Sequence, residues 1–427
     1  AAGLVPRRAS SLSESPPGTN PAAASKKMSG MVEEFHEGET AGAREEREHF
    51  ERVVGSFIGY EEVALAEEKR ARNAAKRLSA DLERLLPPGS MQKRLDLLHE
   101  AARVNADFLR AVVKNQGSFG PLDAAHVGTA GRPPTSRPRE ADFSKVRSTL
   151  HSCVRDWGAE GAAERAQSYD PMVQELLRVL PVVDGVNRNR QRVLVPGAGL
   201  ARLVLEICAA GYAAQGNEFS YHMLLVSNFI LNSRLDPGAI EIRPFIDQPS
   251  NCVEAEDRTR VVSIPDVSPD ELLTRHAGNA QQHDAPVDFS MAAGEFLEVY
   301  RDQTSEWHAV ATCFFLDTAP VALEYVDAIY RLLKPGGAWV NLGPLLYHWV
   351  PSSSADLVAC GDDGTYDERY SLSLEFSWDE LKHAIIARGF DIVKEERRAC
   401  NYTANSKSMM RTHYDTIFFT AIKREIP

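Results

Sequence analysis

A glycine-rich turn between a short apolar strand and a helix constrains the fold of this 427-residue chain more than any other feature. The turn Gly197-Ala198-Gly199 follows the strand-like run 192–196, and an apolar helical segment starts near Leu203. Glycines allow a ligand to approach the backbone closely, and the start of the helix offers N–H groups that have no partner within the helix. The pattern favours a nucleotide-type ligand in a parallel α/β sheet, with a purely structural turn as the alternative.

An acidic residue follows at the spacing that is typical of ribose recognition. Glu218 lies 19 residues after Gly199 and behind a second strand-like run at 211–216. An acid at this place commonly hydrogen-bonds ribose hydroxyls. The dinucleotide fingerprint, however, requires Gly or Ala at its sixth position, where this chain has Arg202. The turn therefore favours a nucleotide ligand other than NAD.

Two later segments indicate which nucleotide is bound. Glu295 and Phe296 come just after a strand-like run, where the carboxylate could accept from the amino group of an adenine and the ring could stack on the base. Further on, the tetrapeptide KPGG at 334–337 joins a helix to the apolar strand 338–342, as in the late strand of S-adenosylmethionine-dependent methyltransferases. Together with the turn, these segments favour S-adenosylmethionine.

The N-terminal part of the chain has a different texture. Residues 1–40 have few large apolar groups and are predicted to be a disordered tail, because they cannot bury enough surface to offset the entropy of ordering. Apolar stripes at helical spacing over 50–58 and 91–112 predict helices. We therefore expect an N-terminal helical region over 41–185, with a flexible linker at 117–140 that is rich in Gly, Pro and Ser.

The C-terminal part alternates short apolar strands with helices, as in a parallel sheet that is covered on both faces. Residues 186–427 are predicted to form this α/β domain, and the segment 236–286 interrupts the alternation and is predicted to be an insertion. A further loop is expected at 350–371.

Charge and cysteine content narrow the class of protein. The net charge is −12 and no face is evidently basic, so nucleic acid is not expected as a partner. The longest apolar runs, such as 309–316, are far shorter than the ~20 residues that cross a bilayer, so no membrane partner is expected. The six cysteines are scattered without a CxxC pair or a metal-ligand spacing, which predicts no metal site and is typical of reduced thiols in cytosol or nucleus.

Several stretches are more particular than these general motifs. They are VRDW at 154–157, LVPGAGL at 194–200, QGNE at 215–218, CFFLDTA at 313–319, NLGPLLYH at 341–348 and SMM at 408–410. On these stretches the chain resembles the carnosine N-methyltransferase family, and the similarity extends from Glu46 to the C-terminus. The resemblance implies a Rossmann-like, seven-stranded class I methyltransferase sheet, preceded by a helical region that often mediates a homodimer.

The same resemblance implies an activity, and the cysteine pattern favours a location. The expected reaction is methyl transfer from S-adenosylmethionine to the imidazole ring of the dipeptide carnosine (β-alanyl-histidine), which gives anserine, with other His-containing dipeptides as further candidate substrates. We expect a cytoplasmic and nuclear enzyme. The alternatives are a protein or peptide histidine N-methyltransferase of the same fold, a cofactor-binding scaffold without catalysis and, disfavoured by Arg202 and the KPGG tetrapeptide, a nicotinamide oxidoreductase.

The resemblance also implies which residues contact the cofactor. Arg155 would bind the methionine carboxylate, Glu218 the ribose, and Glu295 with Phe296 the adenine. Ser152 stands where the family carries Gln, and Glu295 stands where it more often carries Asp. The predicted cofactor residues are Ser152, Arg155, Gly197, Gly199, Glu218, Glu295, Phe296 and Cys313.

Five residues are implied for the substrate, and one of them for catalysis. Asp317 follows the strand predicted at 309–316, at the edge where open α/β sheets bind ligands. A carboxylate that accepts the imidazole N–H fixes the tautomer and makes the other ring nitrogen more nucleophilic. The structural alternatives are Asp317 as a helix cap and Arg155 as the partner of Asp156 or Glu160 in a surface ion pair. The predicted substrate residues are Phe314, Asp317, His348, Tyr402 and Tyr414, with Asp317 as the catalytic residue.

Overall fold

The computed structural model describes residues 41–114, 137–181, 188–279, 288–350, 369–403 and 405–425. The tail predicted at 1–40, most of the linker predicted at 117–140 and most of the loop predicted at 350–371 lie outside these residues. The last residues of the predicted linker are ordered, since Glu140 begins a helix and the backbone N–H of Arg139 donates to the Asp142 carboxylate at 2.9 Å.

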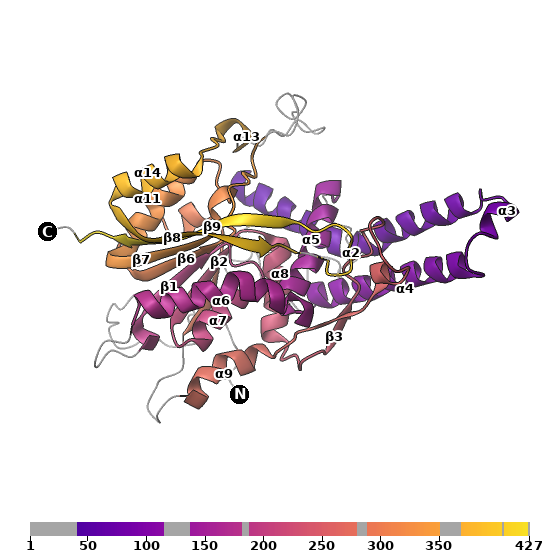
Figure 1. The fold of residues 1–427 in the computed structure, drawn as a ribbon, viewed down its shortest axis with the longest axis horizontal. Helices are drawn as coiled ribbons and strands as arrows, with labels where there is room; N and C mark the ends of the chain where they lie inside the picture. Colours follow the sequence, from indigo (N-terminus) through magenta and orange to yellow (C-terminus); the bar gives the residue numbers. More distant parts are fainter. Residues whose placement is uncertain are drawn as a thin grey trace, which may run out of the picture.

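A seven-stranded sheet forms the centre of the molecule (Figure 1). Its order is β5-β2-β1-β6-β7-β9-β8, and β5, β2, β1, β6 and β7 run parallel while β9 is antiparallel to both of its neighbours. The prediction of a seven-stranded α/β sheet preceded by helices is thereby confirmed. The strands are β1 (Arg192–Pro196), β2 (Ala213–Glu218), β5 (Phe289–Ala293), β6 (Trp307–Cys313), β7 (Leu333–Gly343), β8 (Phe390–Asn401) and β9 (His413–Lys423).

Helices cover both faces of this sheet, as the alternation of its side chains requires. In β1, Val193 and Val195 point into one hydrophobic cluster and Leu194 into the other. Figure 1 shows α6 and α7 on one side of the sheet and α11 and α14 on the other. The helices that follow α5 (Glu140–Trp157) in the chain are α6 (Ala162–Val179), α7 (Arg202–Ala209), α8 (Tyr221–Asn232), α9 (Pro269–Asn279), α10 (Phe296–Val299), α11 (Ala322–Leu332), α13 (Arg369–Leu372) and α14 (Trp378–Arg388).

The N-terminal helices form a long antiparallel hairpin that projects from the sheet domain (Figure 1). It consists of α2 (Ala41–Ala75) and α4 (Ser90–Lys114), joined at the tip by α3 (Ala80–Glu83). The stripe predicted from Phe50 to Phe57 is buried, whereas Ile58, which we included in it, is 42% exposed. Within the described ranges, we find no helix that combines the length and the apolar content needed to span a membrane.

The helical region and the sheet share one core. The hydrophobic cluster on the α7 side runs without a break from Phe50 in α2 to Phe418 in β9. The helix α5 (Glu140–Trp157) contributes Val146, Leu150 and Trp157 to this cluster. The described residues of this region, 41–114 and 137–181, thus share their core with the sheet rather than being joined to it by a hinge.

The segment predicted as an insertion contains a two-stranded antiparallel sheet, β3 (Ile240–Ile242) with β4 (Val262–Ile264). It is fastened to the hairpin by Asn105 of α4, whose amide donates to the Arg243 carbonyl at 2.9 Å and accepts the Arg243 N–H at 2.7 Å. Asn105 is fully buried, so both of these hydrogen bonds are shielded from water.

Candidate active site

The carboxyl ends of the parallel strands bring most of the predicted residues to one edge of the sheet. The turn with Gly197 and Gly199 follows β1, Glu218 is the last residue of β2, and Cys313 is the last residue of β6. Glu295 follows β5 by two residues. These strands are neighbours in the sheet, so residues that are far apart in the sequence meet at this edge.

The turn after β1 requires both of its glycines. Gly197 and Gly199 have φ angles of +67° and +54°, which residues other than glycine rarely adopt. A Cβ at Gly197 would also come within 2.5 Å of the Phe315 ring. Both positions therefore favour glycine, through the backbone conformation at each and through the packing of Phe315 at Gly197.

Glu218 ties the end of β2 to this turn. One carboxylate oxygen accepts the Gly199 N–H at 2.8 Å, and the other accepts the N–H groups of Phe219 and Ser220 at 2.9 and 2.8 Å. Burial raises the pKa of Glu218, although these three hydrogen bonds oppose the shift. A carboxylate offers about four acceptor sites. The oxygen beside Gly199 therefore keeps capacity for one more donor.

Arg155 of α5 lies beside the same turn. A Cβ at Gly199 would be 3.6 Å from its Nη2. Its Nε and Nη2 donate to the two oxygens of Asp156 at 2.7 and 3.1 Å. This ion pair is not the surface pair that we considered as an alternative, because the two side chains are only 14% and 1% exposed. Burial opposes the charged form of Arg155, but the neighbouring carboxylate outweighs burial and raises its pKa.

Asp156 was not among the predicted site residues. It is fully buried, and it also accepts the hydroxyl of Tyr169 at 2.7 Å. Its carboxylate thus fixes the position of the Arg155 guanidinium, and the Tyr169 hydroxyl of α6 fixes the carboxylate in turn. The only signal in the sequence was its position next to Arg155 in the stretch VRDW.

Three aromatic side chains form a cluster next to Arg155. The ring centroids of Phe314 and Tyr402 are 4.6 Å apart, and the ring of Tyr414 lies 6.0 Å from Phe314 and 6.4 Å from Tyr402. The guanidinium carbon of Arg155 lies 5.0 Å from the centroid of the Tyr402 ring. The structure therefore joins the residues predicted for the cofactor to those predicted for the substrate.

Phe314 has a strained backbone at the end of β6. We expected the strand to continue to residue 316, but β6 ends at Cys313 and Phe314 has a φ of +52°. Its N–H donates to the Leu342 carbonyl of β7 at 2.8 Å, and a Cβ at Gly343 would lie 3.3 Å from its backbone. A residue of this kind keeps such a conformation only where its surroundings enforce it, and such residues cluster at functional sites.

Asp317 lies in a single 3₁₀ turn, Leu316–Thr318, and is 3% exposed. Its carboxylate accepts the Leu346 N–H at 2.8 Å. It does not cap the following helix, because α11 begins at Ala322 and its N-cap is Val321. Burial raises the pKa of Asp317, with the Leu346 N–H and the nearby His348 opposing the shift.

His348 reaches Asp317 through the backbone, since its N–H donates to the Asp317 carbonyl at 3.2 Å. Its side chain is exposed. On the other side, burial raises the pKa of Tyr414, and the charges of Tyr402 and Asp317 add to this shift. The five residues predicted for the substrate therefore lie in one neighbourhood.

For three predicted cofactor residues, Glu295, Phe296 and Ser152, the structure shows contacts with the protein itself or burial. The Glu295 carboxylate caps α10 by accepting the Glu298 N–H at 2.9 Å. The ring of Phe296 is 3% exposed and packs edge-on against Phe315 and Tyr325, so the structure does not present it for stacking on an adenine as we expected. Ser152 is buried in α5, one helical turn before Arg155.

Arg202, which argued against NAD, has a structural role. It is 5% exposed, it donates to the carboxylates of Asp266 and Glu206 at 2.6 and 2.8 Å, and its guanidinium lies over the Trp157 ring. The position that is small in a dinucleotide-binding turn here fastens α7 to α5 and to the insertion.

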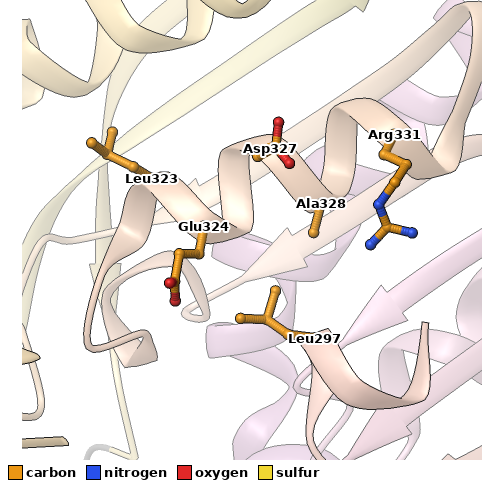
Figure 2. A pocket seen from close by; sticks show the side chains of 6 residues that line it. All are labelled: Leu297, Leu323, Glu324, Asp327, Ala328 and Arg331. Atoms are coloured by element: carbon orange, nitrogen blue, oxygen red, sulfur yellow. The ribbon is translucent and has the colours of Figure 1, made fainter. Parts of the chain in front are cut away.

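A surface hollow lies between α10 and α11 (Figure 2). Arg331 at one end of the hollow donates to the carbonyls of Tyr300, Arg301 and Gln303, so its guanidinium is engaged by the chain itself. None of the predicted site residues lines this hollow. Its lining residues are Leu297, Leu323, Glu324, Asp327, Ala328 and Arg331.

Comparison with known proteins assigns the chain to a family. The family profile described as Carnosine N-methyltransferase matches residues 134–425. The chain is 34% identical to the carnosine N-methyltransferase of Dictyostelium discoideum, over 89% of this chain and 77% of that protein, and 34% identical to that of Rattus norvegicus, over 89% and 87%. The Schizosaccharomyces pombe enzyme of the same name is 33% identical over 87% of this chain and 94% of its own length.

Among solved structures, a putative S-adenosylmethionine-dependent methyltransferase from Listeria monocytogenes aligns with 60% of this chain over 99% of its own length, with 13% identity and a TM-score of 0.31. The family profile covers most of the chain, and these relatives are matched over 77% to 94% of their own length. This chain belongs to the carnosine N-methyltransferase family.

Proposed function

We propose that this enzyme transfers the methyl group of S-adenosylmethionine to the imidazole ring of carnosine and releases anserine. The proposal is supported by the family and, above all, by one observation: the guanidinium of Arg155 lies beside both the glycine turn and the Tyr402 ring, 3.6 Å from where a Cβ of Gly199 would stand and 5.0 Å from the centroid of that ring. A cofactor on the turn and an acceptor among the aromatic rings would therefore be neighbours. Methyl transfer needs this proximity, because the attacking atom and the methyl must be about 3 Å apart and in line.

The residues at the turn suit the cofactor. S-Adenosylmethionine, when bound, supplies a methyl group on a positively charged sulfur. Arg155 would bind its carboxylate, since a guanidinium has five N–H donors and Asp156 accepts two of them. Glu218 would accept a ribose hydroxyl through the oxygen beside Gly199. Gly197 would present bare backbone to the ligand.

Asp317 would activate the acceptor. A neutral imidazole has one N–H and one free lone pair. The carboxylate of Asp317 accepts the N–H, so that the lone pair of the other nitrogen faces the methyl group. Positive charge develops on the ring as the new bond forms, and the carboxylate stabilises it and then holds the proton. The raised pKa of Asp317 makes it a better proton acceptor. The aromatic cluster would pack on the ring and exclude water.

The direct test is incubation with methyl-labelled S-adenosylmethionine and a panel of His-containing dipeptides and longer peptides. We expect label in the dipeptide, with the product mass of anserine when carnosine is the acceptor. Label that appears only in long peptides would favour the protein histidine N-methyltransferase, and no label in any acceptor would favour a binding scaffold.

We also propose a homodimer that forms through the helical hairpin. At its tip the hairpin exposes four leucines, between 37% and 79% of whose surfaces are accessible: Leu78, Leu82, Leu85 and Leu86. A cluster of this kind favours contact with another protein surface. Sedimentation equilibrium tests the mass in solution. The proposal also includes a cytoplasmic and nuclear location, which the free thiols support. Its partner is a dipeptide substrate, with neither nucleic acid nor membrane, and the acidic net charge supports the absence of nucleic acid.

Removing the Glu218 carboxylate should weaken cofactor binding. In Glu218→Ala the ribose hydroxyls lose a buried acceptor, and the affinity for S-adenosylmethionine should fall by ~1–3 kcal/mol in titration calorimetry. Glu241→Ala, which removes an exposed carboxylate of β3, serves as the control. Unchanged affinity in Glu218→Ala would contradict the ribose assignment.

A further inference from the structure

The backbone around Tyr402 is held by two side chains of α6. The N–H of Asn401 donates to the Gln167 side-chain oxygen at 2.8 Å, and the N–H of Thr403 donates to the Glu164 carboxylate at 2.8 Å. The two anchored residues are the immediate neighbours of Tyr402 in the chain. Neither Glu164 nor Gln167 is among the residues that we predicted for the site.

The helical geometry of α6 lets Glu164 and Gln167 hold the same segment together. Glu164 and Gln167 are three residues apart, so they lie on the same face of the helix, one above the other. Glu164 is in the first turn of α6, where the helix dipole favours a negative charge. It is only 7% exposed, so its hydrogen bond to the Thr403 N–H is shielded from water.

The conformation of Thr403 shows that this anchoring opposes strain. Thr403 has a φ of +45°, which is unfavourable for a β-branched residue. This backbone persists only if its surroundings hold it, and the charged acceptor on its N–H does so. The residue before Asn401 also contacts α6, because the thiol of Cys400 donates to the Gln167 carbonyl at 3.5 Å. Hydrogen bonds to α6 are therefore made at Cys400, Asn401 and Thr403, on both sides of Tyr402.

We infer that Glu164 and Gln167 are positioning residues, which clamp the chain on either side of Tyr402 and thereby aim its ring at Phe314 and Arg155. The inference rests on the proposed function, in which Tyr402 contacts the substrate. It assigns to α6, a helix of the N-terminal helical region, a part in acceptor recognition that goes beyond support of the sheet.

A probe on the ring tests the clamp without reference to catalysis. With 3-fluorotyrosine incorporated at position 402 of the full chain, the unmodified protein should give one sharp ¹⁹F resonance. Glu164→Ala and Gln167→Ala should shift or broaden it, whereas Glu164→Gln, which keeps an acceptor, should restore it. The control is Glu160→Ala, which removes a carboxylate that accepts the Ser406 hydroxyl in the segment between β8 and β9, the segment that also contains Tyr402. An unchanged resonance in Glu164→Ala would overturn the inference.

Kinetics test whether the clamp acts through Tyr402. Glu164→Ala should lower kcat/KM for carnosine about tenfold or more, mainly through KM, and change the Kd for S-adenosylmethionine less than about twofold. In a Tyr402→Ala background the same substitution should have little further effect. An undiminished effect there, or an equal loss of cofactor affinity, would mean a general structural role and overturn the inference. Failure of the unmodified protein to methylate carnosine would instead overturn the proposed function, while the ¹⁹F resonance still reports on the clamp.

Discussion

Turnover of carnosine should fall by about 10²–10⁴ in Asp317→Asn, the order expected when a general base is removed. Asparagine keeps the size of the side chain and can still accept the Leu346 N–H, so the local fold should survive. It lacks the negative charge that stabilises the imidazolium and receives its proton. The Kd for S-adenosylmethionine should barely move, because Asp317 lies next to His348 and Tyr414 rather than at the glycine turn. Steady-state rates and titration calorimetry on the same variant measure both quantities.

The pH dependence gives a second reading of the same residue. Burial raises the pKa of Asp317, and only its ionised form accepts the proton. As the pH falls through this raised pKa, the carboxylate is protonated and kcat/KM falls. The imidazole of carnosine also protonates at low pH, near a pKa of about 6.5. The unmodified enzyme should therefore lose activity with two protons on the acid side and Asp317→Asn with one. Near-normal turnover of Asp317→Asn would refute the catalytic role.

Asp156→Ala should destabilise the protein by about 3–5 kcal/mol, because it leaves the buried guanidinium of Arg155 without its counter-ion. It also removes the acceptor of the Tyr169 hydroxyl. The affinity for S-adenosylmethionine should drop more than tenfold, since the guanidinium loses the partner that holds it beside Gly199. Denaturant unfolding and titration calorimetry measure the two effects.

A paired variant separates stability from binding. Replacing both partners, as in Arg155→Met with Asp156→Ala, removes the buried charge and should recover part of the lost stability, whereas cofactor binding should remain weak. If Asp156→Ala loses less than about 1 kcal/mol, as an exposed ion pair would, then Asp156 is not the buried support that the structure indicates.

Those parts of the fold that depend on local patterns could be predicted from the sequence. The strand before Gly197, the acid at Glu218 and the alternation of strands and helices all follow from side-chain period and turn chemistry within short windows. The end of β6 could not be predicted in this way. The run up to residue 316 is apolar, but Phe314 takes a left-handed backbone because its N–H bonds to Leu342 of β7 and Gly343 allows close approach.

The supporting residues of the site depend on contacts that no short window contains. Glu164 meets Thr403 across 239 positions of the chain. The burial of the Phe296 ring could not be predicted for a similar reason, since the rings that bury it, Phe315 and Tyr325, come from the segment after β6 and from α11. A residue type next to a strand end indicates a site, but the burial of its side chain is decided by the other layers of the fold.

The shared core of hairpin and sheet has a consequence for how the molecule comes apart. Phe50 packs against Tyr221 and Phe57 against His222, at ring separations of 5.0 and 5.6 Å. Both partners lie in α8, which begins three residues after Glu218. The hairpin base and the cofactor edge should therefore melt as one cooperative unit, with the calorimetric enthalpy equal to the van't Hoff enthalpy. A catalytic fragment that starts after α4 would lack the rings of α2 and α4 on which α8 rests, Phe50, Phe57 and Phe108, so we expect that the sheet domain does not fold on its own.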